Sequence, residues 1–353
     1  SAYLLEGEVD KERFVTAIDR LVERHESFRT SFAMIGDEVV QFISDTVPTP
    51  VEFAEAPEDQ LGEEIKAFVR PFDLAKAPLL RVKLVSFSAR KHLLLIDMHH
   101  IIADQSSIAI LLREFAELYR GASLLPASVT YKDFAAWQNE RASSGYFDEQ
   151  LAYWKAEFAD GRPVLDLPIA LPRPPVQTFD GSRIHLALDR DCSDAVRALA
   201  RQFGATPYMV FMAALKLLLW KVSGQRDLVI GTAVAGRNRP ELESIVGMFV
   251  NMLAIRSQVD EEMTIADYLH YMKSKLLKAY ENQDCQYESL VEQLALDKDV
   301  TRNALFDVVF NYINRGTEEL SMDGLRLTPV QPGDVACKFD LMWTILESEG
   351  RYD

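Results

Sequence analysis

Cysteine is scarce in this sequence. The 353 residues include only 3 cysteines, and these (Cys192, Cys285 and Cys337) lie far apart. An odd number of scattered cysteines argues against a disulfide framework and fits a reducing compartment. Uninterrupted apolar runs of membrane-spanning length are lacking, and residues 1–7 have no basic region of a signal peptide. We therefore expect a cytoplasmic protein with no membrane partner.

Positive charge is also in short supply. Lysine and arginine number 38 against 54 acidic residues, so the formal net charge is −16. This balance disfavours general binding to phosphate backbones and anionic lipids, so we expect no nucleic-acid partner. Apolar side chains, by contrast, make up 48% of the chain. That content suffices for one large core or two medium ones.

The apolar pattern alternates between helical and strand-like spacing. In the first half the predicted elements are helices over 10–26 and 104–119, strands over 79–87 and 92–98, and a hairpin of 28–35 with 38–43 around Gly36-Asp37. The second half continues in the same style, beginning with a strand over 183–188. The pattern is typical of a mixed α/β (α+β) protein.

A proline-rich stretch separates the two halves. Periodicity ends after residue 160, and the stretch contains Pro163, Pro168, Pro172, Pro174 and Pro175. So many prolines exclude a helix or a central strand. We therefore predict a first lobe over 1–162, a linker over 163–181 and a second lobe over 182–353.

Two histidines and an aspartate follow the strand predicted over 92–98. Successive strand side chains face opposite ways, so His99 and His100 are predicted to point to opposite sides. Helical spacing begins after Asp104, which places Asp104 at a helix N-cap. Such a corner holds an imidazole rigidly, and histidine exchanges a proton near neutral pH. The residues alone leave two interpretations open, a packed pair and an acid/base site.

A metal site is a weaker alternative at this corner. Asp97, His99, His100 and Asp104 would need further ligands from elsewhere in the chain. The remaining histidines and the cysteines show no ligand spacing. We therefore predict no metal.

Six stretches, in order, resemble the core motifs of condensation domains of nonribosomal peptide synthetases. They are Arg24 to Phe32 (RHESFRTSF), Met98 to Ser107 (MHHIIADQSS), Tyr131 to Trp137 (YKDFAAW), Ile245 to Leu253 (IVGMFVNML), Asn282 to Glu288 (NQDCQYE) and Thr301 to Phe306 (TRNALF). A lone HHxxxD motif is a weak signal, but six motifs in family order are not. One departure is Gln105, which stands where the family usually has glycine.

The resemblance implies a fold and a reaction. The expected fold is a V-shaped pseudo-dimer of two chloramphenicol-acetyltransferase-like lobes with a tunnel between them. The expected reaction joins a donor acyl or peptidyl thioester to the amine of an acceptor aminoacyl thioester. Both groups would arrive on 4'-phosphopantetheine arms of donor and acceptor peptidyl carrier proteins, beside the adenylation domain of a multidomain synthetase. The chain itself is expected to bind no cofactor.

The resemblance also implies residue roles at the histidine corner. His100 is the predicted catalytic residue, which orients or deprotonates the amine, and His99 supports the corner. Asp104 is predicted to cap its helix and to pair with an arginine, Arg24 first and Arg29 second.

Further candidates lie beside these residues. Gln105 removes a backbone angle open only to glycine and brings a larger side chain near the tunnel. The candidates for lining the tunnel or binding substrate are Ser106, Ser107, Gly247 and Asn251.

Two alternative functions remain open. A standalone acyltransferase that uses a small amine or alcohol shares the same histidine corner. A catalytically silent docking domain for carrier proteins is suggested by Gln105.

Overall fold

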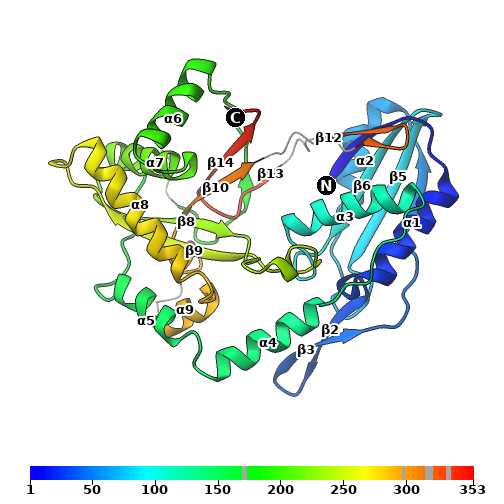
Figure 1. The fold of residues 1–353 in the computed structure, drawn as a ribbon, viewed down its shortest axis with the longest axis horizontal. Coiled ribbons are helices and arrows are strands. Elements are labelled where there is room, and N and C mark those ends of the chain that lie inside the picture. Colours follow the sequence, from blue (N-terminus) through cyan, green and yellow to red (C-terminus); the bar gives the residue numbers. More distant parts are fainter. Residues whose placement is uncertain (169–172, 296–298, 315–320, 331–334) are drawn as a thin grey trace. The chain divides into compact units, whose positions relative to one another are not determined.

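The chain folds into two units, each built on its own β-sheet (Figure 1). The computed structural model describes residues 1–168, 173–295, 299–314, 321–330 and 335–353. Unit 1 comprises the described residues of Ser1–Glu140, Arg237–Phe249 and Glu318–Gly333, and unit 2 those of Arg141–Gly236, Val250–Thr317 and Asp334–Asp353. The predicted mixed α/β class is confirmed.

Unit 1 contains a sheet of six strands within the described residues. Their order is β11 (Ser321–Met322), β12 (Leu325–Val330), β1 (Ala2–Glu6), β6 (Lys91–Met98), β5 (Leu80–Ser88) and β4 (Val51–Glu55). Neighbours are antiparallel except β4 and β5, which are parallel. The central strand β6 reads as a continuous apolar run because both of its faces are buried.

Helices cover both faces of this sheet. Helices α1 (Lys11–Arg24) and α3 (Gln105–Tyr119) share one hydrophobic core with the sheet, and α2 (Leu61–Phe68) packs in a second core against the other face. Helix α1 begins at Asp10, whose carboxylate accepts hydrogen bonds from two backbone N–H groups at 3.0 Å. The buried face of α1 consists of Phe14, Ala17, Ile18, Leu21 and Val22. The helical spacing predicted over 10–26 is thereby confirmed.

A hairpin and short helices complete unit 1. The predicted hairpin forms from β2 (Thr30–Ile35) and β3 (Glu38–Ile43) and turns at Gly36, whose φ of 63° suits glycine. Short 3-10 helices lie at η1 (Glu26–Arg29), η2 (Glu58–Gln60) and η3 (Pro240–Leu242). Helix α4 (Tyr131–Ser143) crosses the division between the units in sequence.

Unit 2 contains a five-stranded sheet within the described residues. The order is β15 (Arg351–Tyr352), β14 (Leu341–Ser348), β10 (Val308–Asn314), β8 (Asp227–Val234) and β9 (Asn251–Gln258). The inner strands are parallel, and β9 and β15 are antiparallel edges. The helices are α5 (Asp148–Glu157), α6 (Arg190–Gln202), α7 (Pro207–Ser223), α8 (Ile265–Glu281) and α9 (Tyr287–Gln293), and a small ribbon pairs β7 (Asp180–Gly181) with β13 (Val335–Ala336).

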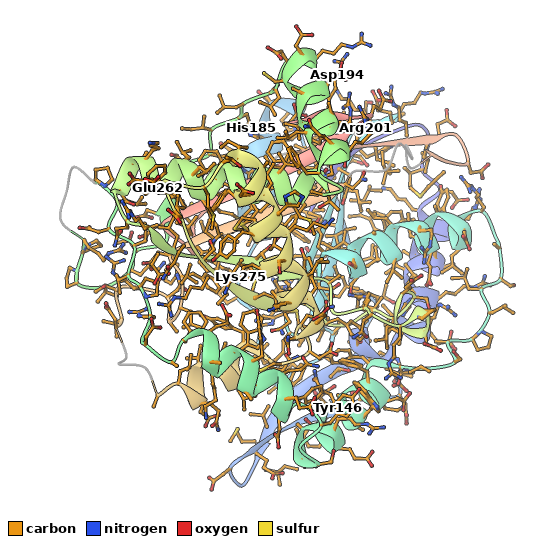
Figure 2. The ribbon with its side chains drawn as sticks, turned by 60° about the vertical axis from the view of Figure 1, so that its left-hand side comes forward. Tyr146, His185, Asp194, Arg201, Glu262 and Lys275 are labelled. Carbon is orange, nitrogen blue, oxygen red and sulfur yellow. The ribbon has the colours of Figure 1, made fainter. Side chains whose placement is uncertain are left out.

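Ion pairs attach helix α5 to the rest of unit 2. Lys275 of α8, labelled in Figure 2, contacts the Glu157 carboxylate of α5 at 2.7 Å. Arg256 of β9 bonds the carboxylates of Asp227 and Asp160, both at 2.6 Å. Residues 148–160 therefore belong to unit 2.

The division into units differs from the boundaries predicted at 162, 163–181 and 182. Helix α5 joins unit 2, and two late segments, 237–249 and the described part of 318–333, join unit 1. The reason is strand pairing, since β12 pairs with β1 over five residues of each strand. Residues 169–172 of the predicted linker lie outside the described part of the chain.

The strand predicted over 183–188 is not formed. Its alternating apolar side chains remain exposed, with Ile184 at 82% and Leu186 at 73%. Its last residue makes a ladder-like contact, a hydrogen bond from the Leu188 N–H to the Tyr352 carbonyl at 2.9 Å. An apolar period of two predicted this strand, but such a period does not by itself supply a neighbouring strand.

None of the described helices is by itself long and apolar enough to span a membrane, although α6 and α7, joined at a bend of 106°, meet the length and composition criteria together.

Candidate active site

The histidine pair lies just beyond the end of β6, in a turn. The His99 N–H donates to the Leu79 carbonyl at 3.0 Å, and the His99 carbonyl accepts from Ile102 N–H at 3.1 Å. Because the pair follows the strand, alternation along a strand does not set its directions, and that argument was wrong. The two side chains still differ, since His99 is half-buried and His100 is exposed.

His99 is held by contacts on its ring. Its Nδ1 accepts a hydrogen bond from the Ile101 N–H at 3.1 Å. The ring also meets the Phe72 ring edge-on, with centroids 6.2 Å apart and planes at 90°. An accepting Nδ1 places the proton of the neutral imidazole on Nε2.

His100 has a free ring by comparison. Within the described residues its imidazole makes no hydrogen bond, and the side chain is exposed to solvent. Both nitrogens are therefore available to a substrate, which is what a general base requires.

Asp104 caps helix α3, as predicted. Its Oδ1 accepts from the Ser107 N–H at 2.8 Å and from the Ser107 hydroxyl at 2.9 Å. The Ser107 hydroxyl oxygen also lies 3.3 Å from the Asp104 N–H, which completes a capping box. Both residues are buried, and these bonds satisfy the N–H groups of Asp104 and Ser107 at the start of the helix.

The charge partner of Asp104 is Arg237, and the prediction of Arg24 or Arg29 was wrong. The Arg237 guanidinium bonds Oδ2 of Asp104, and both side chains are almost fully buried. Arg237 also donates to the Ile245 carbonyl at 2.9 Å and lies over the Phe249 ring at 4.3 Å. The pair thus connects the histidine corner to the 237–249 segment.

Arg24 has a different carboxylate partner. It ends α1 and donates to Glu114 of α3 at 2.9 Å, and the adjacent His25 contacts the same oxygen at 2.7 Å. Glu114 lies ten residues beyond Asp104, about 15 Å along the helix, so Arg24 cannot serve both. Burial raises the pKa of Glu114, but hydrogen bonds and charge from His25 and Arg24 outweigh it and lower the pKa below its ordinary value.

Arg29 bonds backbone carbonyls instead of a carboxylate. Its guanidinium donates to the carbonyls of Val22 at 3.1 Å and Glu23 at 3.3 Å, and also to that of Ser44. These contacts connect the end of α1 to the chain after β3. Arg24 and Arg29 therefore support unit 1 away from Asp104.

Gln105 occupies the first position of α3 with a helical backbone and an exposed side chain. It is not among the residues with positive φ. Its backbone angles are open to any residue, so the glutamine causes no backbone strain at this position. The silent docking domain suggested by the missing glycine loses its structural argument.

Ser107 and Gly247 form a buried contact between α3 and the 237–249 segment. The Gly247 N–H donates to the Ser107 hydroxyl oxygen at 3.1 Å, and that hydroxyl lies 3.0 Å from the Gly247 carbonyl. A Cβ on Gly247 would lie 2.1 Å from the Tyr131 ring. Burial, with the charge of Asp104, raises the pKa of Tyr131. Ser106, on the exposed side of the same turn, is half-buried.

Asn251 lies at the start of β9 in unit 2, and its amide is fully used by backbone groups. Nδ2 donates to the carbonyls of Gln283 at 2.8 Å and Cys285 at 2.7 Å. Oδ1 accepts from the N–H groups of Met252 at 2.9 Å and Tyr287 at 3.1 Å. Of the two predicted uses of this amide, backbone and pantetheine arm, the observed one is backbone.

Sequence reasoning missed Arg237. The available signal was indirect: a carboxylate buried at a helix cap needs a cation, and two arginines, Arg237 and Arg239, lie between β8 and the Ile245 to Leu253 motif. Within the described residues, no group of three or more His, Cys, Asp or Glu side chains gathers as a metal site.

Solved structures of domains from peptide biosynthesis share this fold. A teicoplanin-biosynthesis X-domain, solved in complex with OxyB, has a TM-score of 0.89 at 24% identity, over 100% of this chain and 80% of that one. A four-domain nonribosomal peptide synthetase bound to AMP and glycine has a TM-score of 0.88 at 22% identity, over 99% of this chain and 28% of that one. These likenesses establish the fold.

The chain belongs to the condensation domain family, whose model, described as "Condensation domain", matches residues 1–352. It is 45% identical to tyrocidine synthase 3 of Brevibacillus parabrevis over 98% of this chain and 5% of that protein. It is 42% identical to surfactin synthase subunit 2 of Bacillus subtilis (strain 168) over 97% of this chain and 10% of that protein. The chain thus spans a small part of these relatives. The predicted family is confirmed.

Proposed function

We propose that this domain forms an amide bond between two carrier-bound substrates. The amine of an acceptor aminoacyl thioester attacks the carbonyl carbon of a donor acyl or peptidyl thioester. A C–N bond forms, the C–S bond of the donor breaks, and the sulfur leaves with the proton that the amine loses. The donor chain ends on the acceptor carrier.

The partners follow from the proposed reaction. Donor and acceptor peptidyl carrier proteins would present their 4'-phosphopantetheine arms, and an adenylation domain would load the acceptor. Similarity to tyrocidine and surfactin synthases over nearly all of the chain supports this assignment. The chain itself would hold no cofactor, because both reactive groups arrive covalently attached.

His100 is the proposed catalytic residue. The observation that carries this proposal is an exposed imidazole without hydrogen bonds among the described residues, next to a corner held by the buried Asp104–Arg237 pair. One nitrogen would accept the amine proton and the ring would then return it to the leaving sulfur. His99, whose Nδ1 is occupied, would support the turn.

Alignment of the substrates should contribute more than proton transfer. An α-amine has an ordinary pKa of about 7.7 to 8 and is partly neutral at pH 7, and a thioester is already activated. A positioned base supplies about 10²- to 10⁴-fold, whereas alignment of two bound reactants can reach effective molarities of about 10⁵ M or more. Ser106 and Gln105, on the first turn of α3, are proposed to face the substrates.

The test is a two-carrier assay read by mass spectrometry of the acceptor carrier. His100→Ala should lower product formation by about 10²-fold or more, because the general base is lost. His185→Ala is the matched control, since His185 is also exposed and lies before α6, as labelled in Figure 2. Equal product from His100→Ala and the unaltered chain would refute the catalytic role. Product from a free amine without an acceptor carrier would instead identify a standalone acyltransferase.

A further inference from the structure

A loop between α2 and β5 lies against the histidine corner of unit 1. In this 70–79 loop, the Phe72 ring meets the His99 ring edge-on at 6.2 Å. The guanidinium of Arg81 lies 3.6 Å from the centroid of the same Phe72 ring. Phe72 therefore contacts a fixed cation and the imidazole of His99, and such cation–aromatic and aromatic pairs have preferred geometries.

Arg81 is itself held firmly. Its guanidinium donates to Asp97 at 3.0 Å and to the carbonyls of Arg70 at 2.7 Å and Pro71 at 2.8 Å. Asp97 belongs to β6, two residues before His99, so the same strand that leads to the histidines anchors Arg81. A planar guanidinium with several fixed acceptors has one orientation, and it fixes the backbone next to Phe72.

The loop also bonds the backbone of His99. The Leu79 carbonyl accepts the His99 N–H at 3.0 Å, while the His99 carbonyl and Nδ1 accept from Ile102 and Ile101, each at 3.1 Å. Each polar backbone group of His99 is thus used. His100 is the next residue, so any rotation of the 99–102 turn would redirect its imidazole.

We infer that Phe72 and Arg81 are positioning residues that hold the His99 ring and, through the 99–102 turn, aim His100. Neither residue touches substrate in this scheme. The inference rests on the proposed role of His100 for its effect on turnover, but its effect on the His99 ring is independent of any reaction.

Phe72→Leu tests the inference with two measurements. The first is the position of the imidazole ¹H–¹³C resonances, where loss of the aromatic edge should move the His99 signals. The second is the two-carrier assay, where kcat should fall about 10-fold with KM for the loaded acceptor carrier unchanged, since a misplacement near 1 Å can cost up to about 10²-fold. A purely structural defect would lower the melting temperature without lowering kcat at constant KM.

Phe53→Leu is the matched control. Phe53 also lies near a cation, with the Lys11 ammonium 5.3 Å from its ring, and it contacts Phe14 in the same unit away from the histidines. We expect unchanged His99 and His100 resonances and unchanged turnover. A shift equal to that of Phe72→Leu would overturn the inference, because the effect would not be specific to the loop.

Arg81→Lys provides a second variant should Phe72→Leu fail to fold. It keeps a positive charge beside Asp97 but loses the guanidinium hydrogen bonds to the Arg70 and Pro71 carbonyls. The His99 resonances and kcat are expected to change in the same direction, but by less. Unaltered imidazole signals in both variants would refute the inference, whatever the turnover. If the unaltered chain makes no product, the proposed function fails while the resonance measurement still decides the positioning role.

Discussion

Asp104 divides its two oxygens between local and distant partners. Oδ1 accepts from Ser107 in its own helix, and Oδ2 accepts from Arg237 and from the Phe249 N–H at 3.2 Å. Local capping sets where α3 begins, and the distant pair fixes the 237–249 segment on unit 1. Both oxygens of Asp104 thus have a structural role. The sequence predicted the capping role of Oδ1 from the position of the residue at the start of the helix.

Removing one partner of this buried pair should be costly. Arg237→Met leaves the Asp104 carboxylate buried without its cation, and we expect a loss of about 3 to 5 kcal/mol in the free energy of unfolding. Urea unfolding of the variant and the unaltered chain at pH 7 measures this difference in the free energy of unfolding. The double variant Asp104→Asn with Arg237→Met should recover part of the loss, because the uncompensated charge is gone. Arg70→Met, which breaks an exposed pair with Glu52, should cost at most about 1 kcal/mol.

Gly247 should not tolerate a methyl group. In Gly247→Ala the Cβ would lie 2.1 Å from the Tyr131 ring, so one of the two must move, and we expect a loss of about 1 to 3 kcal/mol. Gly62→Ala in α2 is the opposite case, since a Cβ there meets nothing within 4 Å and alanine favours the helix. In thermal unfolding, the melting temperature should be highest for Gly62→Ala, intermediate for the unaltered chain and lowest for Gly247→Ala. Equal stability of the two variants would contradict the close approach.

At the scale of elements, helix α7 carries a lysine into the core of unit 2. The Lys216 ammonium is fully buried and donates to the carbonyls of Leu228 in β8 at 3.0 Å and Ile255 in β9 at 2.8 Å. Within the described residues it forms no ion pair with a carboxylate. Burial lowers the pKa of Lys216 from 10.5 to about 7, against a smaller opposing effect of Asp227.

This lysine predicts a stability that rises with pH. Between pH 7 and 10.5 the unfolded chain holds the Lys216 proton more tightly than the folded one, so the free energy of unfolding should rise by up to about 1.4 kcal/mol per pH unit. Urea unfolding from pH 7.5 to 9.5 measures this slope. In Lys216→Met the free energy of unfolding should rise less steeply with pH, by that amount. In Lys278→Met, at an exposed position of α8, it should keep the slope of the unaltered chain. Parallel curves for all three would contradict the prediction.

The elements that sequence predicted well are those determined by neighbouring residues. The α3 cap at Asp104, the β2–β3 turn at Gly36 and the apolar face of α1 all depend on side chains within a few positions. The prediction of a strand over 183–188 failed because a strand needs a pairing neighbour, which the local apolar pattern does not determine. Arg237 was missed for the same reason, since 133 residues separate it from Asp104. Motif order identified the family but did not determine which arginine meets which carboxylate.

At the scale of the whole molecule, unit 1 is assembled from three separate stretches of chain. The β1 strand pairs with β12 on one side, and Asp104 is neutralised from the 237–249 segment. A fragment of residues 1–181 lacks both partners. We expect it to show no cooperative unfolding transition in circular dichroism, because an open apolar edge and a buried unpaired carboxylate remain.

The full chain is the reference for that fragment. Adding the residues of 237–249 and 321–330 back through flexible linkers should restore a cooperative transition, since both partners return. A fragment of 1–181 that unfolds cooperatively at the midpoint of the full chain would contradict this account.

The pairing of β1 with β12 has a consequence for synthesis on the ribosome. The residues of α3 emerge long before β12, and at about 5 to 20 residues per second the wait is roughly 10 to 40 s. During that interval β1 has no neighbour at the edge that β12 will occupy, and Asp104 has no cation until Arg237 leaves the exit tunnel. Nascent chains on the same polysome carry the same unpaired β1 edge close to one another. Each chain would therefore need its β1 edge protected from pairing with that of its neighbour until β12 is made.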